Sequence, residues 1–247
     1  MNRTVSFLWR EGKGVVLALA LVLVVRTVAA EPYAVPTPSM VPTLMVGDKL
    51  VATKYAYGYS RYSVPIGEIP MTGRVLDHTP ERGDVIVFRL PRDTSETYVK
   101  RVIGLPGDRV QMKKGRLYIN GEMAARRPAG ALDTVVLGRP VTLHRYIETL
   151  PGGRDHDILE MSDDDALDNT PEFTVPQGQY FMMGDNRDDS LDSRVAAVAG
   201  GVGMVPAENL VGRVDMVLYS HAPDAPLWSP ASWGEIIKRL RLFTQIT

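Results

Sequence analysis

The chain has 247 residues, of which 45% are hydrophobic and 23% are charged, and its formal net charge is -1. This length can bury the core of one sizeable domain with a smaller appendage, or of two modest domains, and a charge near zero does not favour a nucleic-acid partner. The absence of cysteine excludes disulfides, thiolate metal sites and cysteine nucleophiles, and the four histidines lack metal-ligand spacing, so we expect no metal site.

The N-terminus combines basic residues with an apolar run. The run covers residues 14–25, follows three basic side chains and ends at Arg26. Because positive charge stays on the cytoplasmic side, residues 1–30 are predicted to form a cytoplasmic tip and one transmembrane helix. The run is short for a span of about 20 residues, but Arg26 can extend its charge to the lipid headgroups. A removable signal peptide is the alternative, because small residues at 28–30 precede Glu31, and Arg26 favours the retained anchor.

The next segment is rich in proline and carries one serine, Ser39. Prolines at 32, 36, 38 and 42 exclude a helix and favour extended or turn conformations between Glu31 and Asp48. We therefore expect a rigid, exposed arm. Residues 49–62 are predicted to contain strand and loop, and residues 64–80 to be loop.

Runs of β-branched and aromatic residues, bounded by turn residues, predict the strands of the main body. A Lys-Gly turn at 114–115 further predicts a hairpin. The predicted strands lie at 84–90, at 98–103, in the hairpin 109–120, at 180–183 and at 210–219.

Two regions differ from this pattern. Residues 121–172 are loop-rich and are predicted to form an inserted β subdomain or loop region. Their acidic cluster at 162–168 is interpreted as a solvated loop, because it lacks the glycine and terminal glutamate of an EF-hand calcium loop. Within the C-terminal segment 221–247, apolar residues recur at helical spacing over 233–243 beside basic ones. They predict an amphipathic helix that fits core packing and a membrane surface equally well.

Lysine is the candidate base for a serine nucleophile, since no GxSxG elbow supports a serine-histidine-acid arrangement. The pKa of such a lysine must fall from about 10.4 to about 8, which costs roughly 3 kcal/mol, and burial in an apolar strand supplies the shift. Lys100 lies in YVKRVI, where alternation places it on the face of Tyr98 and Val102. The alternative for Lys100 is an edge-strand lysine that prevents aggregation.

Three separated motifs favour the catalytic interpretation. They are VPTPSMVPT, YVKRVIGLPGD and GDNRDDSLDSR, and RGDVIVFRLP at 82–91 is a fourth element. In this order, after an apolar N-terminal segment, they resemble type I signal peptidases, the membrane-bound serine-lysine proteases that remove signal peptides from exported proteins. The resemblance covers most of residues 15–220, and its specificity comes from the set, since one short motif alone means little.

The resemblance implies roles for residues at matching positions. Ser39 matches the nucleophile and Lys100 the general base, while the N–H of Ser39 and the hydroxyl of Thr37 match the donors to the oxyanion. Ser190 matches the serine whose hydroxyl orients the lysine amine. Thr37 stands where serine is commoner, which keeps the donor and adds a methyl group, and Pro38 stands where the family often has glycine.

Two ion pairs are also implied, which would brace the third motif against the strand. Asp185 is expected to pair with Arg101, and Asp192 with Arg194. The connection after Arg194 is longer and richer in glycine and alanine than in many relatives.

Substrates of the family have small residues at positions -3 and -1 before the cleaved bond, which fit shallow apolar pockets. The matching wall positions are Val35, Met40, Leu44, Tyr98 and Val99. Leu44 and Val99 also suit plain core positions. An extended substrate would add as a strand to the edges beside Ser39 and Lys100.

The resemblance completes the expected architecture: a mainly β fold with one N-terminal transmembrane helix and a C-terminal amphipathic helix. Residues 31–120 and 173–220 are expected to form an antiparallel β-sheet catalytic core, and residues 121–172 a smaller inserted β subdomain. The expected location is the bacterial cytoplasmic (inner) membrane, crossed once, with the catalytic domain on the extracytoplasmic (periplasmic) side.

The implied activity is cleavage of signal peptides from exported preproteins after small-x-small sites, without a cofactor. Membrane lipid and a nearby secretion translocon are the other expected partners, and nucleic acid is not. A non-catalytic module that binds signal peptides is one alternative, although such a module needs neither nucleophile nor base. A self-cleaving serine-lysine regulatory protease is another, although an apolar segment stands where its DNA-binding domain would be.

Overall fold

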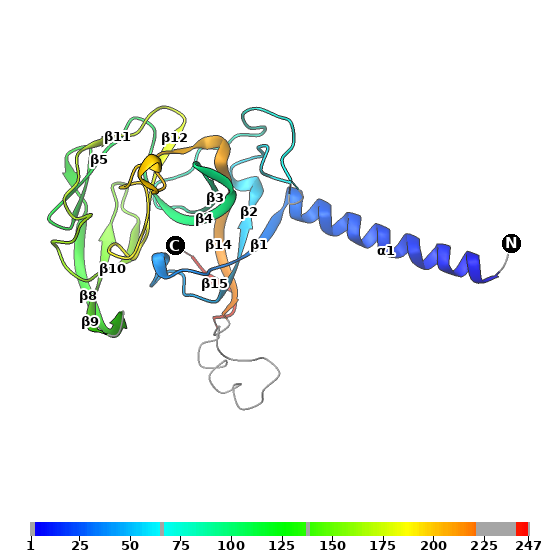
Figure 1. Cartoon of the computed structure of the whole chain (residues 1–247), viewed down its shortest axis with the longest axis horizontal. Helices are drawn as coiled ribbons and strands as arrows, with labels where there is room; N and C mark the ends of the chain where they lie inside the picture. Colours follow the sequence, from blue (N-terminus) through cyan, green and yellow to red (C-terminus); the bar gives the residue numbers. More distant parts are fainter. Residues whose placement is uncertain (1–2, 65–66, 137–138, 221–240, 247) are drawn as a thin grey trace.

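The computed structural model describes residues 3–64, 67–136, 139–220 and 241–246. Strands dominate these residues, and the paired strands run antiparallel to each other (Figure 1). The prediction of a mainly antiparallel β fold is therefore confirmed.

Eight of the described strands form the main sheet, in the order β1-β2-β14-β3-β4-β12-β13 with β15 paired to β14. The runs of β-branched residues predicted four of them correctly: β3, β4, β12 and β14. The bounds are β1 Ala30–Ala34, β2 Asp48–Thr53, β3 Val85–Leu90, β4 Asp93–Gly104, β12 Gln179–Met183, β13 Val205–Pro206, β14 Leu210–Ser220 and β15 Thr244–Gln245.

Two smaller sheets accompany the main one within the described residues. The first contains the predicted hairpin and has the order β11-β5-β6-β7, with bounds β5 Arg109–Lys113, β6 Arg116–Ile119, β7 Glu122–Met123 and β11 Phe173–Thr174. The second has the order β10-β9-β8, with bounds β8 Ala125–Val136, β9 Arg139–Thr149 and β10 Asp155–Glu160.

Of the two alternatives predicted for residues 121–172, the strands β8, β9 and β10 agree with β structure and not with a loop region. The bounds of these strands could not be predicted, because apolar residues do not alternate regularly along them. Polar cross-strand pairs join them instead: Arg145 binds Asp157 at 2.8 Å and Thr142 donates to Asp133 at 2.7 Å. The division of the chain into a core and an inserted subdomain stays a prediction.

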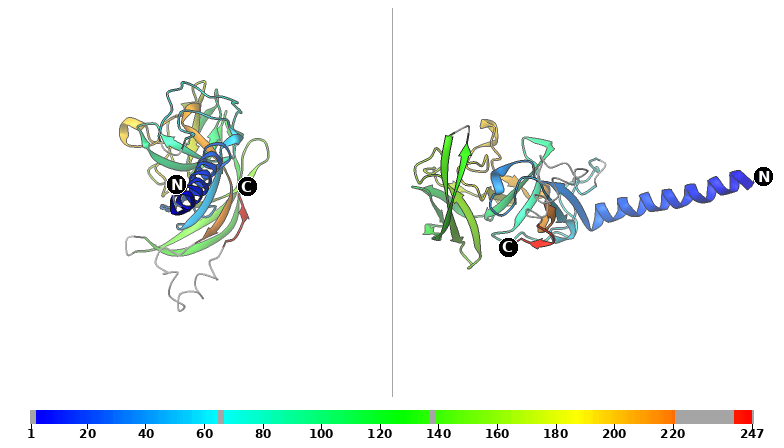
Figure 2. Two further views of the ribbon diagram at one scale, coloured as in Figure 1. Left: turned by 90° about the vertical axis from the view of Figure 1, so that its right-hand side faces the viewer. Right: turned by 90° about the horizontal axis from the view of Figure 1, so that it is seen from below.

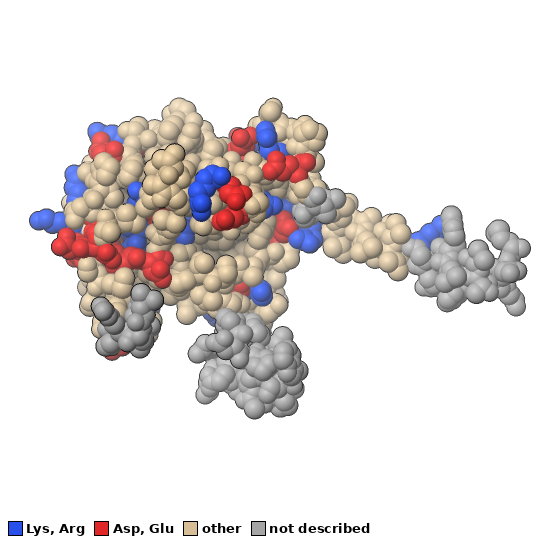
Figure 3. Space-filling view, in the orientation of Figure 1, with Lys and Arg blue, Asp and Glu red and all other residues tan. Residues whose placement is uncertain are grey.

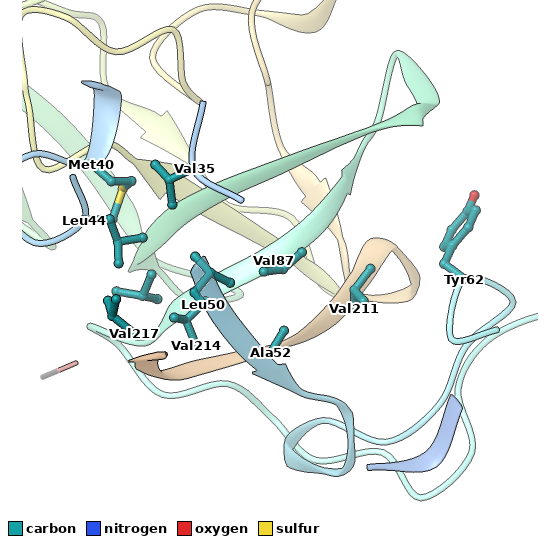
Figure 4. Close-up of a cluster of buried hydrophobic side chains, with 11 residues drawn as sticks. Val35, Met40, Leu44, Leu50, Ala52, Tyr62, Val87, Val211, Val214 and Val217 are labelled. Atoms are coloured by element: carbon teal, nitrogen blue, oxygen red, sulfur yellow. The ribbon is translucent and has the colours of Figure 1, made fainter. Parts of the chain in front are cut away.

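The core beneath the main sheet draws side chains from the proline-rich segment. Val35, Met40 and Leu44 pack against β2, β3 and β14, as Figure 4 shows. The predicted exposed arm is therefore wrong for these three residues, whereas Pro36, Thr37 and Pro38 are exposed. The first part of the segment is β1, an edge strand, and an edge position tolerates Pro32 because the missing N–H can face away from the neighbouring strand.

The helix α1 (Arg3–Val28) leads directly into β1, with Ala29 between them. Figures 1 and 2 show it extending away from the strands, at the end of the molecule opposite β8 and β9. Glu31 of β1 binds Arg26 at 2.5 Å and the buried Lys54 at 2.8 Å, so ion pairs close the junction. No helix among the described residues combines the length and the apolar character that a membrane crossing requires.

The predicted C-terminal helix over 233–243 lies mostly outside the described residues. Residues 241–243 are described and are not helical, and β15 follows them at the edge of β14. Arg241 binds the buried Asp48 at 2.7 Å, which holds this end of the chain against the main sheet.

Candidate active site

Ser39 lies in a short 3₁₀ turn, Pro38–Met40, between β1 and β2. Pro38 suits the first position of the turn because its ring fixes φ near the helical value. The Ser39 side chain is buried, and its N–H lies in the first turn, where backbone N–H groups have no partner within the helix. The turn thus holds the hydroxyl and an available donor on one short segment.

Lys100 lies in the middle of β4 and is 2% exposed. Its Nζ hydrogen-bonds to Oγ of Ser39, although the two residues are 61 positions apart. The structure therefore brings together the two side chains that the motifs singled out. Since β4 lies between β3 and β12, the amine is held by a strand that is paired on both sides.

The environment of Lys100 favours the neutral amine. Burial is the largest cause and lowers the pKa of Lys100 to about 8, against the opposing effects of Asp192 and Asp185. A shift of this size corresponds to about 3 kcal/mol in favour of the neutral form. A substantial fraction of Lys100 is therefore able to accept a proton near neutral pH.

Thr37 lies beside the nucleophile at the start of the same turn. Its Oγ1 is 3.4 Å from Oγ of Ser39, and its side chain is exposed. A hydroxyl at this position, together with the Ser39 N–H, can donate to an oxygen that becomes negatively charged next to Ser39.

Both expected ion pairs are present. Asp185 accepts two hydrogen bonds from the guanidinium of Arg101, at 2.9 and 2.8 Å, and the side chains of both are almost fully buried. Asp192 and Arg194 form a second buried two-point pair, at 2.9 Å for each bond. Arginine forms such paired bonds because its planar donors match a carboxylate. The first pair holds the loop 184–194 beside β4, and the second fixes two side chains within the loop.

The hydroxyl of Ser190 is not placed as the resemblance implied. Ser190 is buried, but among the described residues its Oγ has no hydrogen-bond partner, Lys100 included. The hydroxyl lies instead against Gly184, where a Cβ would come within 2.2 Å of Ser190 Oγ and 2.5 Å of the Ser39 carbonyl oxygen. Gly184 is thus needed for the close approach of this loop to the nucleophile.

Two residues that sequence reasoning missed connect the loop to the nucleophile turn. Asn186 donates its N–H to the Ser39 carbonyl at 3.1 Å, and Thr43 donates to Asp185 at 2.5 Å. Both lie inside the quoted motifs, at Thr43 of PSMVPT and Asn186 of GDNR. Their position in those motifs could have indicated their importance, because neither side chain suggests catalysis by itself.

A groove of about 620 Å³ runs past Ser39 and Lys100. Four of the five expected wall residues line it: Val35, Met40, Tyr98 and Val99. Leu44 is the exception, since it is completely buried in the core cluster of Figure 4, and its assignment to the substrate pocket is wrong. It packs inward because the chain turns back toward β2 after Met40.

The described residues contain no group of three or more metal-ligating side chains that could hold an ion. The polar contacts around Ser39 come from a lysine, a threonine and the carboxylate-guanidinium pairs.

Comparison with known proteins gives a consistent result. A family model described as signal peptidase, peptidase S26, matches residues 8–219. The signal peptidase I of Rickettsia typhi is 40% identical over 227 residues, covering 89% of this chain and 82% of that protein. The signal peptidase I of Rickettsia canadensis is 39% identical with the same coverage. A solved signal peptidase I from Enterococcus faecalis is 29% identical, covers 56% of this chain and 97% of that chain, and has a TM-score of 0.32.

Proposed function

Since this chain belongs to the signal peptidase family, peptidase S26, we propose that it cleaves signal peptides with Ser39 as nucleophile and Lys100 as general base. The family is one of peptidases, so the chemistry is hydrolysis of a peptide bond. The observation that carries the proposal is the hydrogen bond between Lys100 Nζ and Ser39 Oγ, buried at the side of an open groove.

The proposed reaction uses groups that are already in contact. The neutral amine of Lys100 takes the Ser39 proton while Oγ attacks the carbonyl carbon of the substrate. The carbonyl oxygen becomes negative and accepts hydrogen bonds from the Ser39 N–H and the Thr37 hydroxyl. The Lys100 ammonium then protonates the departing amine, and water, activated by the same lysine, hydrolyses the acyl-enzyme.

The proposed substrate is the signal peptide of an exported preprotein, with small residues at -3 and -1. The groove walls of Val35, Met40, Tyr98 and Val99 support this, because apolar walls accept alanine and exclude larger side chains by overlap. Tyr98 and Val99 belong to β4, so a substrate bound as an extended strand would pass both of them and Lys100.

One preprotein and two variants of it, with leucine at -1 or at -2, test the proposed function. Replacing alanine by leucine at -1 is expected to reduce kcat/KM for the purified protein on the order of 100-fold, because the larger side chain does not fit the pocket. The rates are measured by separating precursor and mature product on gels. Leucine at -2, where the side chain points away from the pockets, should leave the rate nearly unchanged. Equal cleavage of all three substrates, or binding without turnover, would contradict the proposal.

A pH profile tests the role of a neutral amine. Burial lowers the pKa of Lys100 to about 8, so the neutral, active form increases as pH rises toward that value. We expect kcat/KM to rise about tenfold per pH unit below pH 8 and to level off above it. The rates are measured from pH 6 to 10 in buffers of constant ionic strength. A rate that does not change over this range would argue against Lys100 as the base.

We also propose that α1 anchors the protein in the bacterial cytoplasmic membrane, with the strands on the extracytoplasmic side. Seven large apolar side chains of α1 are each more than half exposed: Val15, Val16, Leu17, Leu19, Leu21, Val22 and Val24. Figure 3 presents this part of the helix as largely uncharged surface. Exposed apolar side chains on a projecting helix support contact with lipid. The basic residues before the run support a cytoplasmic N-terminus.

A further inference from the structure

The loop 184–194 is held from two sides. On one side, Asp185 binds Arg101 of β4, and Ser193 donates its N–H to the Met182 carbonyl of β12. On the other side, Leu159 of β10 donates its N–H to the Asp185 carbonyl and accepts the N–H of Arg187, each at 2.9 Å. The three-stranded sheet β10-β9-β8 therefore hydrogen-bonds to the backbone of this loop, which packs against the Ser39 turn.

A buried ion pair joins the same loop to β9. Arg187 donates from Nη1 to Oε1 of Glu148 at 3.1 Å and from Nη2 to Oε2 at 2.5 Å. Arg187 is 0% exposed and Glu148 is 1% exposed. Apolar side chains of similar volume would hold the loop against β9 as well or better. They would not, however, fix the direction of the Arg187 guanidinium group. The ion pair therefore serves to fix the position of Arg187.

Glu148 is the acidic group that binds the Arg187 guanidinium directly. Glu160 also acts on Arg187, but burial raises the pKa of Glu160 to about 8, which favours its neutral form near pH 7. His156 lies 3.5 Å from both side chains, but burial, helped by Arg101, lowers its pKa to about 4, so the ring is neutral near pH 7. The carboxylate of Asp185 is held at both oxygens by Arg101.

A short chain of contacts leads from this pair to the surroundings of Lys100. The carbonyl oxygen of Arg187 accepts a hydrogen bond from Nη2 of Arg194 at 2.5 Å. The same Nη2 binds Asp192, whose carboxylate also accepts the N–H of Gly184 at 3.1 Å. Asp192 and Arg194 are two of the charges that act on the Lys100 amine. A displacement of Arg187 would therefore change the position of both.

We propose that Glu148, from the second sheet, is a positioning residue for signal-peptide cleavage. It holds Arg187, which fixes the Arg194–Asp192 pair and thereby the loop beside Ser39 and Lys100. This role rests on the proposed function. It also gives β9 and β10 a role at the site, since β9 supplies Glu148 and β10 supplies the backbone bonds of Leu159.

The test is preprotein cleavage by the full chain carrying Glu148→Ala, at a temperature where circular dichroism shows it folded. We expect kcat to fall about 10 to 100-fold, as for small misplacements of reacting groups. KM should change little, because neither Glu148 nor Arg187 lines the groove. Glu148→Gln keeps an oxygen that faces Arg187 and should lose less. Glu172→Ala, which removes an exposed partner of Arg109 at 3.6 Å, is the matched control and should retain full kcat.

Folding effects are separated by a double variant, Glu148→Leu with Arg187→Met. Removing both charges avoids an uncompensated buried arginine, so this variant is expected to fold and still show the low kcat. A wild-type kcat in the folded Glu148→Ala or double variant would overturn the positioning role. Ser39→Ala is assayed in parallel: activity in that variant would refute the proposed function itself, and the positioning role with it.

Discussion

The Ser39→Ala variant is expected to cleave preproteins with a kcat lower by on the order of 10⁴-fold or more. The change removes the oxygen that is hydrogen-bonded to Lys100 and leaves the 3₁₀ turn and the groove otherwise intact. The variant should still bind the signal peptide. Single-turnover cleavage on gels measures the rate, and fluorescence of a labelled signal peptide measures binding.

Ser95→Ala is the matched control for this variant. Ser95 lies on β4, the strand of Lys100, but it is exposed and its hydroxyl binds Asp93 at 2.6 Å. Loss of that hydroxyl should leave kcat unchanged. If Ser39→Ala kept more than a few per cent of the wild-type rate, another group would have to be the nucleophile.

The Lys100→Met variant is expected to lose about 10³-fold or more in kcat, because Ser39 then has no base to accept its proton. Methionine has a similar length and is apolar, so it suits a site where the lysine is 2% exposed. Burying an amine is unfavourable, and the variant should therefore be at least as stable as the wild type in urea unfolding.

This combination distinguishes a catalytic lysine from a structural one. A lysine that only supports the sheet would, when replaced, lower stability and activity together. Lys113→Met, on the separate strand β5, is the control and should change neither kcat nor the response to pH. Near-normal cleavage by the Lys100→Met variant would exclude Lys100 as the base.

The strands of the main sheet could be predicted where the sequence carries a compact apolar signal. Residues 85–90 combine β-branched and aromatic side chains and form β3, which is buried on both sides. The strands β8, β9 and β10 could not be found in this way, because polar pairs join them: Thr142 of β9 with Asp133 of β8, and Arg145 of β9 with Asp157 of β10. Each of these strands is stabilised by the neighbouring strand with which it pairs, and the local sequence of one strand does not show that neighbour.

Burial of the proline-rich segment was missed for a related reason. Its buried apolar residues, Val35, Met40 and Leu44, are separated by prolines and polar residues and show neither strand nor helix periodicity. They become core residues because β1 pairs with β2 and turns the segment back over the sheet.

The candidate site was predictable through its motifs and not through spacing alone. No periodicity brings Ser39 near a residue 61 positions away, whereas the motif resemblance named both Ser39 and Lys100. The same resemblance did not place the Ser190 hydroxyl, which depends on how the loop packs against Gly184. Glu148 lay outside every motif, since its importance arises from the contact of one sheet with a loop of another.

The junction between α1 and β1 limits how far Ser39 lies from the helix. A single residue, Ala29, separates the helix from the strand, and Glu31 ties both to Lys54. Ten residues after Ala29, the chain reaches Ser39, and the five residues of β1 cover roughly 17 Å of that path. If α1 is embedded in lipid as we propose, this short connection keeps Ser39 at one distance from the bilayer, and the proposed cleavage would occur at one depth along an emerging chain.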